Sequence, residues 1–198
     1  MMAPGGSLSH PAYGQLVESH WIRVALATTV ALFLCAMLSW SLWPARSQGL
    51  LLATFALAMV GLGHIWPVQL LCYRLWTHVG PQDFYAYHVA WWHSIWSVIF
   101  VPAGLLFVCV IAIMRYRPPG VGRQLLWSEM GLQLLLIVLT AIWFGPLMGR
   151  LATRQTGLLM HNYTLLIGTH WVRVAIVTGY TLVAFLMVVK SANPVSGR

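Results

Sequence analysis

Long apolar runs, separated by short polar connections, dominate the pattern of the chain. Each run has roughly 20 residues or more, which is the length that an α-helix needs to cross the hydrocarbon core of a bilayer. A bilayer offers no water to backbone N–H and C=O groups, so each such run must be helical. Five runs meet this requirement, at residues 21–43, 50–72, 90–114, 124–148 and 168–189. The pattern therefore predicts an all-α, polytopic membrane helix bundle.

The connections divide the chain into two parts. Residues 1–48 are expected to hold an N-terminal tail and the first transmembrane helix, an uncleaved signal anchor because its apolar run is too long for a signal peptide. Residues 49–198 are expected to form a four-helix membrane unit whose short connections make neighbouring helices antiparallel. Within that unit, residues 151–167 mix polar side chains with leucines, which is typical of a short interfacial helix leading into the last span.

One short pattern occurs twice. Residues 19–28 resemble residues 169–178, and both segments contain the order His-Trp-x-Arg at the start of a predicted span. One explanation is mechanical, because a tryptophan anchors a helix at the interface and an arginine extends to it. The other explanation is that one helix is a copy of the other. Both helices run in the same direction, so they are not the inverted repeats of many secondary transporters. A transporter or channel is therefore disfavoured.

Composition and charge narrow the class of protein further. Hydrophobic residues make up 60% of the chain and charged residues 7%, which excludes a water-soluble fold. The formal net charge of +8 is thinly spread, as expected for basic residues that flank membrane spans, and indicates no nucleic-acid partner. The three cysteines show no CxxC spacing, so neither a disulfide framework nor a metal site is predicted.

Basic residues favour one orientation in the membrane. One end of the predicted bundle carries six of them, which are Arg46, Arg115, Arg117, Arg123, Lys190 and Arg198. The positive-inside rule then makes this end cytoplasmic. The N-terminus is expected outside and the C-terminus in the cytoplasm. This excess of basic residues is weak, because two more arginines, Arg23 and Arg173, lie just inside their spans at the other end of the bundle.

Histidines gather at the other end of the predicted bundle, where all eight fall. Imidazole is a common axial ligand of b-type haem, which needs two histidines at similar depth on facing helices. His64 and His93 fit that requirement best, and His88 and His170 lie nearer the surface. The alternative is that these histidines only hydrogen-bond headgroups, water or carbonyl groups. His88 and His93 are five residues apart, so they are not an i, i+4 chelating pair, and no metal site is expected.

Two charged residues fall inside predicted spans, where a charge is expensive unless it finds a partner. Arg173 is expected either to extend to the interface or to bind Glu18, Asp83 or an anionic ligand. Glu129 is the only carboxylate inside a span, and it is expected either to belong to a functional site or to form a shallow ion pair, with Arg123 or Arg46 as its partner.

Prolines inside spans mark a region where a pocket can form. Pro67, Pro102 and Pro146 each interrupt the hydrogen bonds of a predicted helix, and the freed carbonyl groups must be satisfied by neighbours or water. Pro67 lies three residues from His64. Kinks at these positions are expected to open space near the histidine-rich end.

The order of landmarks from residue 50 to residue 190 resembles a family of small, largely uncharacterised bacterial multi-pass membrane proteins. The residues that carry the resemblance are Gly63, Pro67-Val68-Gln69, Tyr73, Val79-Gly80, Phe84, Tyr87-His88, Ile95, Pro102, Pro146, Leu151 and Trp171-x-Arg173. More distantly, the arrangement is similar to the anthrone-oxygenase-related membrane proteins, some of which oxygenate polyphenolic substrates. The resemblance implies a four-helix unit in a bacterial inner membrane and a site for an aromatic substrate.

Two functional hypotheses follow. The first is an accessory or subunit-like membrane protein, with lipid and protein subunits as partners and a ligand site at the outer face, since no complete catalytic set can be assembled. The alternative is a redox protein that binds b-type haem, quinone or an aromatic substrate. Its binding residues would be His64, His88, His93, His170 and Arg173, with Arg173 stabilising an anionic oxygen or a propionate.

Overall fold

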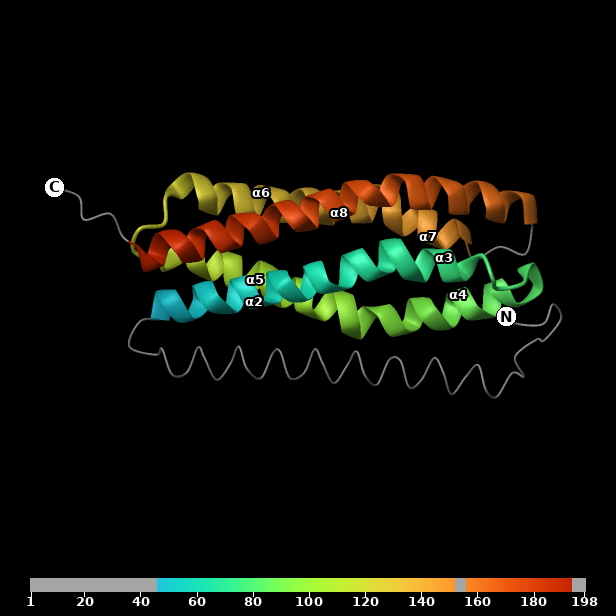
Figure 1. Cartoon of the computed structure of the whole chain (residues 1–198), viewed down its shortest axis with the longest axis horizontal. Coiled ribbons are helices and arrows are strands. Elements are labelled where there is room, and N and C mark those ends of the chain that lie inside the picture. The colour runs from blue at the N-terminus through green and yellow to red at the C-terminus, as the bar shows by residue number, and fades with distance from the viewer. Residues whose placement is uncertain (1–45, 152–155, 194–198) are drawn as a thin grey trace.

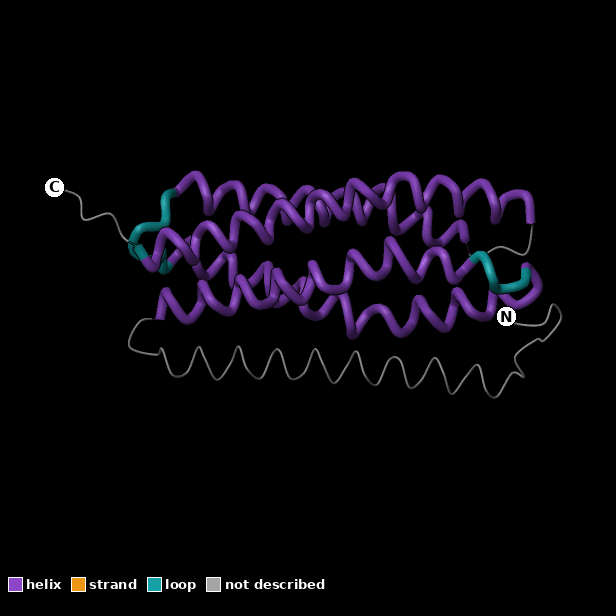
Figure 2. Tube along the Cα trace, in the orientation of Figure 1, coloured by secondary structure: helices purple, strands orange, loops and turns teal. Residues whose placement is uncertain are grey.

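The structure, a computed structural model, describes residues 46–151 and 156–193 and is an elongated bundle of helices (Figure 1). Three rods each consist of two α-helices joined by a π-helical turn, and the fourth is a single helix. In chain order they are α2 (Arg46–Pro67), η2 (Val68–Cys72), α3 (Tyr73–Trp76); α4 (Pro81–Ile95), η3 (Trp96–Phe100), α5 (Val101–Arg115); α6 (Arg123–Leu139), η4 (Thr140–Phe144), α7 (Gly145–Leu151); and α8 (Thr156–Ala192). Successive rods run in opposite directions, and the loops lie only at the two ends (Figure 2).

The all-α membrane fold predicted from the apolar runs is confirmed. Within the described residues, four helical stretches are long and apolar enough to cross a membrane: Ser47–Trp76, Val98–Arg115, Arg123–Leu151 and Met160–Ala192. The chain is therefore an integral membrane protein. The first predicted span, residues 21–43, lies outside the described residues.

The segment expected as an interfacial helix is not a separate element. From Thr156 onward it forms the first part of α8, which continues without a break for 37 residues. The physical reason is that no proline occurs between Thr156 and Ala192, so nothing interrupts the hydrogen bonds from residue i to i−4. At 1.5 Å per residue α8 is about 55 Å long, well beyond a hydrocarbon core of about 30 Å.

The bundle core consists of two clusters. In the half that contains Lys190, leucine, valine and alanine side chains from α2, α5, α6 and α8 pack together around Ile113, Ala184 and Met187. In the other half the core is richer in aromatic rings, with Tyr73 and Trp76 at its centre. Large apolar side chains such as Leu71, Val108 and Ile142 face outward, as expected of a surface in contact with lipid.

Each π-helical turn lies beside one of the three prolines in the spans. Pro67 directly precedes η2, and Pro102 and Pro146 follow η3 and η4 by two residues. A proline ring clashes with the carbonyl group four residues earlier, and for Pro102 and Pro146 that carbonyl, of Val98 and of Ile142, lies in the wider turn, which relieves the clash. Residues of all three turns border one cavity, but that the prolines open this space stays a prediction.

Candidate functional site

The cavity lies between α8 and the three π-helical turns. Its wall includes Val68 from η2, Phe100 from η3 and Phe144 from η4, and α8 supplies His170 and Arg173. The volume is about 30 Å³, which is room for about two water molecules or a small polar group. Most of the lining is aromatic or aliphatic, so the few polar side chains determine what can bind.

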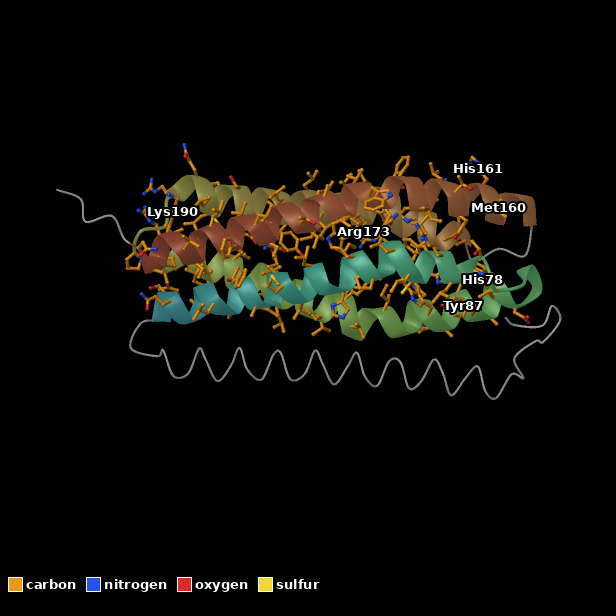
Figure 3. All side chains as sticks on the ribbon, in the orientation of Figure 1. His78, Tyr87, Met160, His161, Arg173 and Lys190 are labelled. Carbon is orange, nitrogen blue, oxygen red and sulfur yellow. The ribbon has the colours of Figure 1, made fainter. Side chains whose placement is uncertain are left out.

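Arg173 supplies the charge of this site. Figure 3 shows it near the middle of the bundle, between α8 and the rod of α2 and α3. Its Cζ lies 4.9 Å from the centroid of the Phe144 ring, a cation–π contact, and its buried Nε has no hydrogen-bond partner. Of the expected partners, Asp83 is exposed at the start of α4, and Glu18 lies outside the described residues. Arg173 therefore meets no carboxylate within residues 46–151 and 156–193.

His170 is fixed beside Arg173 by a buried amide. Its Nδ1 lies 2.8 Å from Oε1 of Gln69, whose Nε2 donates to the backbone oxygen of Ile167 at 3.4 Å. Because an amide oxygen can only accept, Nδ1 must carry the proton. In the neutral imidazole, Nε2 is then left as an acceptor. The two polar side chains of α8 at the cavity are thus complementary, because Arg173 donates hydrogen bonds and Nε2 of His170 can accept one.

A series of aromatic rings leads away from His170. The Tyr73 ring contacts His170 edge to face with centroids 4.8 Å apart, and Trp76 contacts Tyr73 at 5.0 Å. Trp76 in turn meets Trp91 at 4.9 Å. The Tyr163 hydroxyl donates to the backbone oxygen of Tyr73 at 2.6 Å and holds this residue in place. Edge-to-face contacts of this kind stabilise a rigid wall.

His88 belongs to this wall rather than to the cavity. Its ring stacks on Phe84 with centroids 5.8 Å apart, and its Nε2 lies 2.9 Å from the backbone oxygen of Met148. Its Nδ1 is buried without a partner. Burial lowers the pKa of His88, and the hydrogen bond to Met148 opposes that shift in part. The imidazole therefore stays neutral at ordinary pH.

His64 and His93 do not line the cavity. The His64 Nδ1 lies 2.6 Å from the backbone oxygen of Val60 on its own helix, and His93 is exposed. A bis-histidine haem needs two imidazoles that face one space. Among the described residues, His170 is the only histidine that lines the cavity. The volume of the cavity is far too small for a haem macrocycle. The arrangement as it stands does not fit a b-type haem.

Glu129 is not in the expected shallow ion pair. Its side chain is completely buried in α6, where Oε1 accepts a hydrogen bond from Nε2 of Gln133 at 3.0 Å. Oε2 has no partner. Arg123 is exposed and does not pair with it, and the side chain of Arg46 lies outside the described part of the chain. Gln133, one turn along the same helix, is its hydrogen-bond partner.

The sequence left three residues of the site unassigned: Gln69, Tyr73 and Phe144. A signal for Gln69 existed, because an amide inside an apolar span needs a hydrogen-bond partner just as an arginine does. Tyr73 and Phe144 gave no such signal, since an aromatic residue in a span is usually packing or interfacial anchor. Comparison of the chain with protein-family models, curated proteins and solved structures finds no match.

Proposed function

We propose that this integral membrane protein binds a flat, aromatic ligand that carries an anionic or strongly accepting oxygen, and that it does so as an accessory protein or subunit. The cavity of about 30 Å³ has room only for the anionic group of such a ligand, beside Arg173, so the ring can pack on the aromatic wall only if the lining side chains move apart on binding. The resemblance to the anthrone-oxygenase-related proteins favours the same ligand class and stays a prediction.

One observation carries the proposal: an arginine inside the bundle without a carboxylate partner among the described residues. A guanidinium group away from water costs free energy unless an anion or acceptor compensates it. The Phe144 ring supplies part of that compensation, but its contact leaves the Arg173 Nε unpaired. An oxyanion in the cavity would accept from Arg173, and a ligand hydroxyl could donate to His170.

The depth of the site favours access from the histidine-rich side. Counting from Lys190 at 1.5 Å per residue places Arg173 about 25 Å and His170 about 30 Å along α8, close to one hydrocarbon thickness. With the basic end in the cytoplasm of a bacterial cell, as the positive-inside rule predicts, the cavity lies at the outer boundary of the inner membrane. A ligand can then enter from the interface.

Binding of 1-naphthoate to the full chain in lipid nanodiscs tests the proposal. We expect saturable quenching of tryptophan fluorescence, since Trp91 and Trp92 line the cavity. A charge-assisted hydrogen bond is worth about 1.5–3 kcal/mol, so Arg173→Leu should weaken binding by at least about tenfold. Arg173→Lys should retain part of the affinity, because it keeps the charge.

The matched control is Arg115→Leu, which removes an arginine at the opposite end of the bundle. Arg115 contacts the Tyr116 ring at 5.5 Å and does not line the cavity. Its replacement should leave the affinity for 1-naphthoate unchanged. If Arg173→Leu binds 1-naphthoate as tightly as the unaltered protein, the proposed role of Arg173 is wrong.

A redox role is the second candidate, and the ring contacts from His170 through Tyr73 and Trp76 favour it. A quinone bound at Arg173 would have its anionic reduced forms stabilised by the guanidinium charge. The reduction potential of 1,4-naphthoquinone should then be higher in nanodiscs that contain the protein than in empty ones. Equal potentials would remove this candidate while leaving the binding role intact.

A further inference from the structure

The second charged group inside the bundle is Glu129, whose role the cavity does not explain. Its side chain is wholly buried, in a part of α6 where Leu126 and Met130 also belong to the core. Gln133 donates one hydrogen bond to it, and Oε2 receives none. An ionised carboxylate has about four sites for accepting hydrogen bonds, so a single donor leaves most of its solvation unreplaced.

The helices packed against α6 bring few ionisable groups near Glu129. From α8, the Tyr180 ring lies within electrostatic reach of both Glu129 and Arg173. The ionisable side chains of α5 are Cys109 and, at its end, Arg115. Among the side chains that the structure describes, no cation forms an ion pair with Glu129.

Glu129 lies close to the basic end of the bundle. It is six residues from Arg123, or about 9 Å along α6. The hydroxyl of Ser191, near the end of α8, is likewise buried without a hydrogen-bond partner. The starts of α2 and α6 and the end of α8 meet at this end (Figure 1). One buried polar atom without a partner thus lies at the basic end itself.

From this geometry we propose that Glu129 is a proton-binding site inside the bundle, filled from the basic end, whose occupancy responds to the charge at Arg173. In the step itself a proton adds to the free Oε2 and turns the carboxylate into a neutral carboxylic acid. The positive charge of Arg173 favours the ionised form, and neutralising that charge favours the protonated form. The proposal does not depend on which ligand occupies the cavity.

Infrared spectroscopy of the full chain in lipid, recorded as a function of pH, tests the first part. The chain has only three acidic side chains, so the C=O stretch of a protonated carboxyl can be assigned by substitution. We expect such a band at pH 7 that Glu129→Gln abolishes and Asp83→Asn leaves unchanged. Because Gln resembles the neutral acid in size and polarity, Glu129→Gln should also fold. The absence at pH 7 of a band that depends on Glu129 would overturn the proposal.

The same titration in an Arg173 variant tests the link. Arg173→Gln removes the charge but keeps a polar side chain, and it should raise the midpoint of the Glu129 band by up to roughly one pH unit, because the lost positive charge no longer favours the carboxylate. Arg173→Lys, which keeps the charge, should leave the midpoint near its original value. Arg150→Leu, which removes an exposed arginine at the far end, should not move it. An unchanged midpoint in Arg173→Gln would show that the two sites are independent.

Discussion

His88 is a buried histidine that the structure keeps neutral. Its ring is 2% exposed and stacks on Phe84, and burial lowers its pKa from the ordinary value of 6.5. In the unfolded chain the same imidazole regains its ordinary pKa. The unfolded state therefore binds more protons below about pH 6.5, and the folded state loses relative stability as the pH falls.

This difference predicts a pH-dependent effect of one substitution. Relative to His88→Gln, the unaltered protein should lose up to about 1.4 kcal/mol of unfolding free energy per pH unit below pH 6.5 and nothing above it. Reversible denaturation in mixed detergent micelles at several pH values measures the difference. His78 is exposed, so His78→Gln serves as the matched control for loss of an imidazole. Parallel pH profiles for the unaltered protein and His88→Gln would refute the assignment.

At the scale of elements, α2 and α8 approach closely where Gly61 faces Tyr180. A Cβ atom at Gly61 would lie 2.5 Å from the Tyr180 hydroxyl, whose ring is 4% exposed and has little room to move. Gly61→Ala should therefore destabilise the protein by about 1–3 kcal/mol. Gly63 has no atom within 4 Å of its Cβ position, so Gly63→Ala should have no effect or stabilise by up to about 1 kcal/mol.

Denaturation of the two alanine variants measures this difference. The double variant Gly61→Ala with Tyr180→Phe separates the clash from a general effect of alanine, because Phe lacks the hydroxyl oxygen. It should recover most of the stability lost in Gly61→Ala alone. If the loss is the same with and without the hydroxyl, the close approach of α2 and α8 at this point is not the cause.

The sequence predicted the spans well but not the directions of their side chains. The run at residues 50–72 lies within the observed span Ser47–Trp76, because hydrophobic length alone determines where a helix can cross. Which side chains meet depends also on rotation about the helix axis. A π-helical turn adds one residue to a turn and rotates everything after it by about 100°. With η2 between His64 and Tyr73, depth alone could not predict that His170 meets Gln69 instead of another histidine.

At the scale of the whole molecule, the bundle is longer than the bilayer that it crosses. The rod from Pro81 to Arg115 has 35 residues and α8 has 37, or more than 50 Å each. The basic residues at one end mark one boundary of the membrane. Part of the aromatic half, including the start of α4, then extends beyond the hydrocarbon on the other side. Labelled side chains mark the two ends of the bundle: Lys190 lies at one end, and His78 and His161 lie at the other (Figure 3).

The positive-inside rule predicts which end faces the cytoplasm, and cysteine labelling in intact cells checks it. In a background with Cys35, Cys72 and Cys109 replaced by Ala, Arg117→Cys places a thiol in the loop between α5 and α6, and Thr77→Cys places one at the end of α3. Both positions are exposed, so each thiol is accessible from its own side. A membrane-impermeant maleimide should label the thiol at position 77 in intact cells and the one at position 117 only after permeabilisation. The reverse pattern would put the Arg173 cavity at the cytoplasmic boundary, and the ligand would then have to come from inside the cell.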